Sequence, residues 1–246
     1  MIIVIPASSE DAVSEKGLEA LIKFGPYQNH EALVVAKPSD EARLKVVFDK
    51  VQNLFSKVST HVFSQDGPSA PPSDINFCWF HSAHYLKYVA NSVAPWFWFG
   101  AQATPLKSGW LDSLESEYNL AKMPFLGAFV DTELVSADGT TYKEGQHLAR
   151  SAVYSQEYLP NSSLASHSPL FPINYEVFCQ NEIVPRAHNT SLIQVAGDVK
   201  SSSVLYHGHL KEAAPEPSES SGKPSGKPSG KRSGKTEDKL EKAALE

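Results

Sequence analysis

Residues 95–118, PWFWFGAQATPLKSGWLDSLESEY, constrain the fold of this chain most strongly. The four consecutive aromatic residues 96–99 predict a strand that is buried on both faces. The small and polar residues 100–104 predict a turn, and a helix follows with apolar residues at helical spacing: Trp110, Leu111, Leu114 and Tyr118. Open α/β sheets place their ligand sites where a buried strand ends in such a turn and the chain continues into a helix.

The N-terminal quarter alternates between apolar runs and amphipathic segments. Residues 1–6, 30–36 and 60–63 predict strands, while residues 10–23 and about 40–57 predict helices. Strands that alternate with helices favour right-handed crossovers and a parallel sheet. This segment is Rossmann-like, but the chain has no GxGxxG motif, so a dinucleotide oxidoreductase is weakly supported.

The middle of the chain continues the same pattern. Residues 76–91 predict an aromatic-rich helix, and residues 123–130 predict another buried strand. Residues 131–142 predict a hairpin with Asp138-Gly139 at its turn. We therefore expect an α/β protein with a mixed, mostly parallel sheet flanked by helices.

Composition limits the class of protein. A chain of 246 residues accommodates one α/β domain and a tail, and its net charge of -6 gives no bulk attraction to nucleic acid. Its two cysteines, Cys78 and Cys179, lie in apolar runs and predict buried thiols. No apolar run reaches the roughly 20 residues of a membrane span, and no signal peptide is evident, so we expect a cytoplasmic protein.

Residues 212–246 differ sharply from the rest in composition. They consist mostly of Pro, Ser, Gly, Lys and Glu, which predicts a disordered tail after a folded domain at residues 1–211. Ser-Gly-Lys repeats at residues 221–235 form a basic patch that could contact nucleic acid or another anionic partner. A flexible solubilising tail is the favoured interpretation.

Two anchors in this chain resemble the GT-A glycosyltransferases, particularly small members from phage and bacterial genomes. The anchors are PWFWF…PLKSGWLDSLESEY at residues 95–118 and YHGHLK at residues 206–211, and the resemblance covers residues 1–211 in order. It implies a GT-A fold and transfer of a sugar from a nucleotide-sugar donor to an acceptor hydroxyl. It also implies a divalent cation, Mn or Mg, that binds the donor diphosphate.

The chain departs from that family at the acidic triplet that holds the metal, where it has Gly100, Ala101 and Gln102. Three interpretations follow. The protein transfers sugar without metal, with basic side chains supplying the positive charge; or it has lost catalysis and binds only; or the triplet is a substitution that inactivates a working enzyme.

The resemblance implies further donor-binding residues. Pro6, Ala7 and Ser8 match the loop after the first strand, although Ser8 is equally explained as a helix cap. Asn76 and His81 lie on the helix that packs near the nucleotide in the family, and an aromatic core helix is the stronger alternative.

Basic residues later in the chain complete the expected donor site. Arg150 replaces a family glycine and could face a phosphate. His207 matches the family's metal-binding histidine, with a solvent-exposed strand end as the alternative, and Lys211 matches its phosphate contact.

The acceptor hydroxyl must lose a proton during transfer, which calls for a carboxylate base. Glu176 best matches the acidic residue of the family, and Glu182 is the second candidate. A surface glutamate is the simpler explanation for either residue.

The leading hypothesis is therefore a glycosyltransferase-type protein, metal-independent or inactivated at the triplet. A modified DNA base of a phage is one acceptor it suggests, in which case the protein would work in the host cytoplasm. The alternative is a non-catalytic nucleotide-sugar or partner-binding protein on the same fold. An α/β hydrolase is disfavoured because the chain lacks GxSxG and P-loop motifs.

Overall fold

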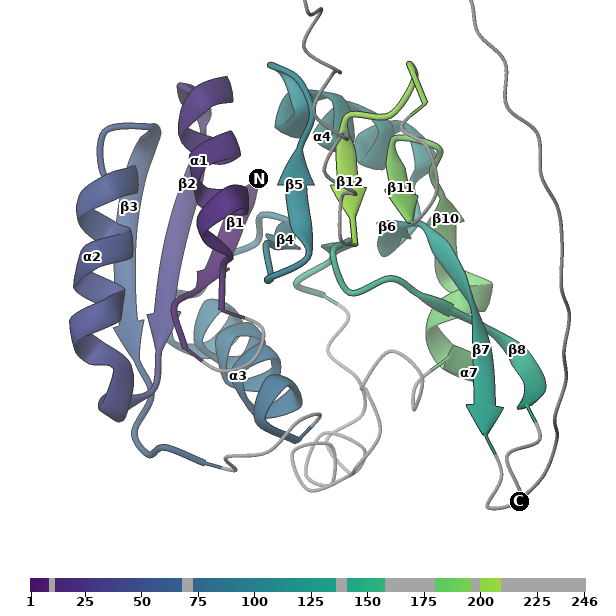
Figure 1. The fold of residues 1–246 in the computed structure, drawn as a ribbon, viewed down its shortest axis with the longest axis horizontal. Coiled ribbons are helices and arrows are strands. Elements are labelled where there is room, and N and C mark those ends of the chain that lie inside the picture. The colour runs from purple at the N-terminus through teal and green to yellow at the C-terminus, as the bar shows by residue number, and fades with distance from the viewer. Residues whose placement is uncertain (9–11, 68–72, 136–140, 158–179, 196–199, 209–246) are drawn as a thin grey trace, which may run out of the picture. The chain divides into compact units, whose positions relative to one another are not determined.

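A computed structural model describes residues 1–8, 12–67, 73–135, 141–157, 180–195 and 200–208 of the chain. The predicted hairpin turn, Cys179, Glu176, Lys211 and the tail at 212–246 lie outside these described residues. Along the rest of the chain, strands and helices alternate as the sequence indicates (Figure 1).

A seven-stranded sheet forms the centre of the fold, in the order β10-β6-β9-β4-β1-β2-β3. Neighbouring strands pair in parallel except at β9, which is antiparallel to both β4 and β6. The predicted mixed, mostly parallel sheet is therefore confirmed. Its strands are β1 (Ile2–Pro6), β2 (Tyr27–Ala36), β3 (Phe55–Val62), β4 (Trp96–Trp98), β6 (Phe125–Gly127), β9 (Val153–Tyr154) and β10 (Ala187–Asn189).

The register of the central strands brings their carboxyl ends to one edge of the sheet. Val4 of β1 pairs with Leu33 of β2 and with Trp98 of β4. The amide of Phe99 donates to the carbonyl of Val4, which continues the pairing one residue beyond β4. The loops that follow β1, β2 and β4 therefore start at the same edge.

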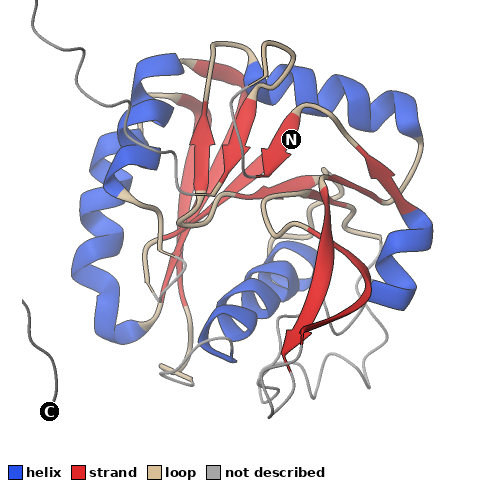
Figure 2. Cartoon of the chain, turned by 45° about the vertical axis from the view of Figure 1, so that its right-hand side comes forward, coloured by secondary structure: helices blue, strands red, loops and turns tan. Residues whose placement is uncertain are grey.

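Helices cover both faces of this sheet (Figure 2). They are α1 (Glu15–Phe24), α2 (Glu41–Val51), α3 (Ser73–His84), α4 (Trp110–Ala121) and the short α7 (Gln180–Ile183), with a π-helical turn at Tyr85–Val89 and 3-10 turns at Pro38–Asp40 and Val184–Arg186. Because side chains alternate along β1, Ile3 packs with α1, α2 and α4, while Val4 packs with α3. The aromatic run that the sequence places in a buried strand is almost fully buried.

Two smaller sheets complete the described structure. The first has the order β11-β12-β5 and comprises β5 (Ala103–Pro105), β11 (Ile193–Val195) and β12 (Leu205–His207). The second is the antiparallel hairpin of β7 (Phe129–Val135) and β8 (Thr141–Leu148), which confirms the predicted hairpin pairing.

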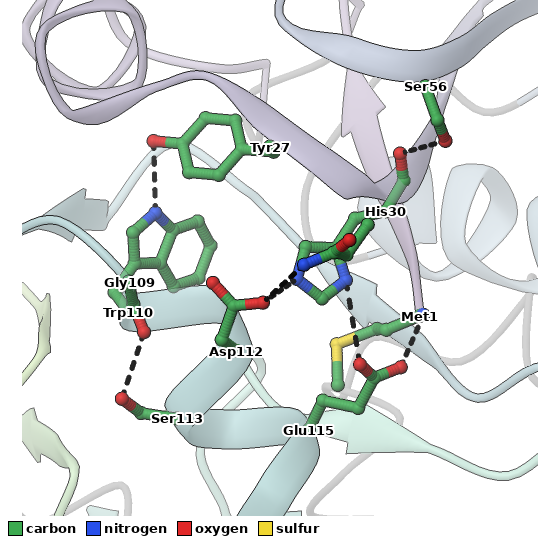
Figure 3. Close-up of polar contacts among 10 residues, drawn as sticks. Met1, Tyr27, His30, Ser56, Gly109, Trp110, Asp112, Ser113 and Glu115 are labelled. Carbon is green, nitrogen blue, oxygen red and sulfur yellow. Dashed lines mark hydrogen bonds and ion pairs between the residues drawn. The ribbon is translucent and has the colours of Figure 1, made fainter.

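Polar contacts attach α4 to the start of the sheet (Figure 3). The indole Nε1 of Trp110 donates to the Tyr27 hydroxyl over 3.1 Å. Nε2 of the buried His30 lies 3.1 Å from Asp112 Oδ1, and the amino group of Met1 donates to Glu115 over 2.5 Å. These contacts fix α4, the helix that follows the turn at residues 100–103, against β1 and β2.

Several expected boundaries are wrong. The helix predicted at about 40–57 ends at Val51, and β3 begins at Phe55 rather than at Thr60. Pairing with β2 explains the earlier strand, because Phe55 lies opposite Tyr27 and their rings stack with centroids 5.0 Å apart. Tertiary contacts of this kind override the local helical pattern.

Other predicted elements are shorter or divided. The helix expected from residue 10 begins at Glu15, with Ser14 as its N-cap. The helix expected at 76–91 starts at Ser73 and changes to a π-helical turn at Tyr85. The strand expected at 123–130 is divided between the central sheet and the hairpin, as β6 and β7.

Within the described part of the chain, no helix has the length and apolar character needed to cross a membrane.

Candidate functional site

The turn at residues 100–103 lies at the carboxyl edge of the central sheet. The amide of Ala103 donates to the carbonyl of Gly100 over 3.1 Å, which closes the turn. Gly100 is buried, Ala101 is partly exposed and the side chain of Gln102 is exposed. The turn connects β4 of the central sheet to β5 of the small sheet, so its position is fixed from both sides.

Strand β12 packs directly against this turn. His207 pairs with Ala103 across β12 and β5, and the amide of Gly208 donates to the carbonyl of Gln102 over 2.9 Å. Gly208 has a φ of 139°, a conformation that residues with a Cβ rarely adopt. The structure therefore brings His207 to the triplet that the sequence aligned with the acidic metal site, although the two are more than a hundred residues apart.

The imidazole of His207 is held in a partly buried position by Ser151. Its Nδ1 lies 2.9 Å from the hydroxyl oxygen of Ser151, which is itself buried. Burial, followed by the nearby charges of Arg150 and His147, lowers the pKa of His207 from 6.5 to about 4. The ring is therefore neutral near pH 7.

Residues 147–151 include Arg150 and His147, the two basic residues whose charges act on His207. The amide of Ala149 donates to the carbonyl of Ala128 over 2.8 Å, and the carbonyl of Arg150 accepts from the Tyr154 hydroxyl over 2.9 Å. These contacts hold the connection between β8 and β9. The same connection carries Ser151, which contacts His207 of β12.

Buried polar groups occupy the carboxyl ends of β1 and β2. Pro6 and Ala7 are buried, and the Ser8 hydroxyl accepts from the amide of Lys37 over 2.9 Å. The Lys37 ammonium forms an ion pair with Asp74 at the start of α3, and both side chains are buried. Ser8 therefore does not cap the following helix; its hydroxyl ties the loop after β1 to the end of β2.

Helix α3 contributes two of the expected residues. Asn76 is buried, with 1% of its surface exposed. The His81 ring packs 4.1 Å from the Phe77 ring and 5.7 Å from the Phe63 ring, between centroids. Burial, then His84 and His61, lower the pKa of His81. This environment matches the aromatic core helix that the sequence offered as the alternative for His81.

The structure describes only one of the two candidate carboxylates, Glu182. Glu182 lies on α7, and the Gln180 side chain of that helix approaches Gly145 of β8. Glu176, like Lys211, is outside the described residues. Glu182 therefore belongs to the hairpin side of the fold.

The residues at the turn do not fit a divalent cation such as Mn or Mg. These ions prefer several oxygen ligands that include carboxylates, whereas residues 100–102 offer backbone carbonyls and one amide. Across the described ranges, no group of three His, Cys, Asp or Glu side chains is arranged to hold a metal ion. Two basic residues, Arg150 and His147, instead lie near enough to His207 for their charges to lower its pKa, and His207 itself pairs beside the turn. Basic side chains of this kind suit an anion.

Sequence reasoning missed three residues of this edge: Lys37, Asp74 and Ser151. Lys37 lies in a polar segment whose sequence indicates only the end of a strand. Ser151 has no motif, and its neighbour Arg150 was the only signal of a polar site there. Their roles depend on contacts between distant segments, which local patterns do not reveal.

Comparisons with known proteins place the fold. No protein-family model and no curated protein matches this chain. The crystal structure of mouse xyloside xylosyltransferase 1 in its apo form is similar, with a TM-score of 0.50 and 9% sequence identity over 87% of this chain and 98% of that chain. The structure of 4-diphosphocytidyl-2C-methyl-D-erythritol synthase from Anaerococcus prevotii DSM 20548 has a TM-score of 0.41 and 9% identity, over 77% of this chain and 85% of that one. At such identities the likeness concerns the fold alone, which is GT-A-like.

Proposed function

We propose that this protein uses a nucleotide-sugar donor and transfers the sugar to an acceptor hydroxyl. The observation that carries the proposal is the docking of His207 and Gly208 on the turn at residues 100–103, at the carboxyl edge of a GT-A-like sheet. This edge is where open α/β folds bind ligands.

The polar groups after β1 and β2 support a donor site that extends along this edge. The buried Lys37 joins these groups, because its amide donates to Ser8 and its ammonium pairs with Asp74, at the same edge as the turn. In the proposed orientation, the nucleoside of the donor lies toward these groups and its diphosphate toward residues 100–102.

The transfer step is a substitution at the anomeric carbon of the donor sugar. A base takes the proton of the acceptor hydroxyl, the acceptor oxygen forms a bond to the anomeric carbon, and the bond from that carbon to the diphosphate oxygen breaks. The electron pair leaves with the nucleoside diphosphate. Glu176 is the first candidate base and Glu182 the second, both by resemblance, and only Glu182 lies on the described part of the chain.

A non-catalytic nucleotide-sugar-binding protein is the second candidate function. The observation that favours it is the lack of any carboxylate at residues 100–102, because the family's metal site is missing there. Binding of a nucleotide-sugar without release of nucleoside diphosphate would distinguish it from a transferase.

The test combines binding with turnover. The chain is titrated calorimetrically with nucleoside diphosphates and nucleotide-sugars, and release of nucleoside diphosphate is followed with acceptors that include DNA carrying hydroxymethylated bases. Binding with turnover supports a transferase, and binding alone supports the second candidate. Failure to bind any of these nucleotides would overturn both.

A further inference from the structure

We propose that the side chains of Arg150, His147 and His207 bind a diphosphate group directly beside the turn at residues 100–102. They take the place of a divalent cation. The inference rests on the proposed function, because it assigns the diphosphate part of the donor site. It also resolves the conflict between a GT-A-like fold and a turn whose residues do not fit a metal ion.

The geometry places His207 beside the turn and brings the segment that carries Arg150 and His147 up to His207. Strand pairing sets His207 opposite Ala103, and the bond of 2.9 Å between its Nδ1 and the Ser151 hydroxyl brings residues 147–151 to the same place. Arg150 directly precedes Ser151 in sequence, and His147 lies three residues before Arg150, on β8. The charges of Arg150 and His147 both act on the His207 ring.

The chemistry of these groups suits a phosphate. A guanidinium offers several N–H donors in a planar fork that matches phosphate oxygens. A neutral His207 whose Nδ1 accepts the Ser151 hydroxyl proton carries its own proton on Nε2 and can donate it to an anion. Positive charge fixed at the leaving group performs the role that a metal ion has in other phosphate sites.

The side chains of residues 100–102 allow direct contact between the turn and a diphosphate. Gly100 and Ala101 have no charged side chain, and the exposed Gln102 offers an amide N–H donor. A carboxylate at any of these positions would repel a diphosphate unless a cation lay between them. The same substitutions that remove the metal ligands therefore also remove that repulsion.

The test uses inorganic pyrophosphate and uridine diphosphate as probes on the full chain, with EDTA or with manganese present. We expect calorimetric affinities that are equal in the two conditions. Arg150→Gln should weaken binding of both probes by about tenfold or more, as expected for loss of charge-assisted hydrogen bonds. Lys50→Gln is the matched control, because it removes one positive charge from an exposed site on α2.

A second variant guards against misfolding of the first. Gln102→Glu is nearly isosteric at an exposed position, and it should weaken pyrophosphate binding in EDTA while manganese restores it. Circular dichroism confirms that each variant is folded. Binding by the unaltered chain that requires manganese, or affinities that neither variant changes, would overturn the inference.

The outcomes separate this inference from the proposed function. Metal-independent binding of pyrophosphate without binding or turnover of any nucleotide-sugar would leave an anion site and refute the transferase. Turnover that depends on manganese would support the transferase and refute the metal-free site.

Discussion

The Nδ1 atom of His207 lies 2.9 Å from the hydroxyl oxygen of Ser151, across a separation of 56 residues in the chain. This contact joins β12 to the connection between β8 and β9, and it fixes the imidazole beside the turn at residues 100–103. The orientation of this ring therefore depends on a side-chain contact between segments that share no sequence motif, in addition to the strand pairing of His207 with Ala103.

Replacing Ser151 by alanine tests this contact. Ser151→Ala removes a buried hydrogen bond and should lower the free energy of unfolding by about 1 kcal/mol. The freed ring should gain access to water, so the pKa of His207 should rise toward its ordinary value. Urea unfolding and NMR titration of the imidazole provide the two measurements. Ser202→Ala, at an exposed position, is the control and should leave both unchanged.

The lowered pKa of His207 predicts a loss of stability in acid. Its pKa is about 4 in the fold and 6.5 ordinarily, so between these values the unfolded chain binds more protons than the folded chain. The contribution is complete above pH 6.5 and is lost as the pH falls to about 4, amounting to about 3 kcal/mol. Below pH 4 the loss is complete.

Comparison with His207→Asn isolates this effect. Asparagine keeps a polar group for Ser151 but does not titrate, so the variant should lose less stability between pH 7 and pH 4. His30, His61 and His81, whose pKa values are also lowered, contribute equally in both proteins. Parallel pH profiles of unfolding free energy for the two proteins would contradict the prediction.

The buried Lys37–Asp74 ion pair should show strong coupling. In a double-mutant cycle with Lys37→Met and Asp74→Asn, we expect a coupling free energy of about 1–3 kcal/mol, because either single change leaves the other group buried without its partner. Denaturant unfolding gives the four stabilities. The exposed Lys57–Glu31 pair, with 3.7 Å between Nζ and Oε2, is the control and should couple by less than about 0.5 kcal/mol.

Gly17 allows α1 to approach the strand that follows the turn. A Cβ at this position would lie 2.7 Å from the backbone carbonyl oxygen of Ala103. Gly17→Ala should therefore destabilise the fold by about 1–3 kcal/mol, although alanine favours a helix. It should also weaken uridine diphosphate binding, since β5 would shift with the turn.

Thermal unfolding and calorimetry measure these two effects. Lys16→Ala, on the exposed surface of the same helix, should change neither quantity. A Gly17→Ala protein as stable as the unaltered chain would show that α1 and β5 can separate without cost.

Local patterns predicted the central sheet well because its strands are apolar and continuous. The runs at β1, β2 and β4 pack between helices on both faces, so their apolar residues are buried, although β2 also carries exposed polar residues such as Glu31. Boundaries were less predictable, as β3 shows, because its first residue is fixed by pairing with Tyr27 of β2. The division of residues 123–130 into β6 and β7 likewise follows from two different pairing partners.

The candidate site was predictable only in part. The small turn at residues 100–102 and the later His207 could be named from the sequence, because the aromatic strand and the YHGHLK segment are distinctive. Ser151, Lys37 and Asp74 could not, since each gains its place from a residue far away in the chain.

The sequence by itself determined the α/β class, the buried aromatic strand and the absence of carboxylates at its turn, since these depend on composition and local periodicity. Only the tertiary structure decided that His207 pairs opposite Ala103 and that Ser151 lies against its ring. The physical reason is that strand pairing and side-chain burial join segments whose separation along the chain carries no local signal.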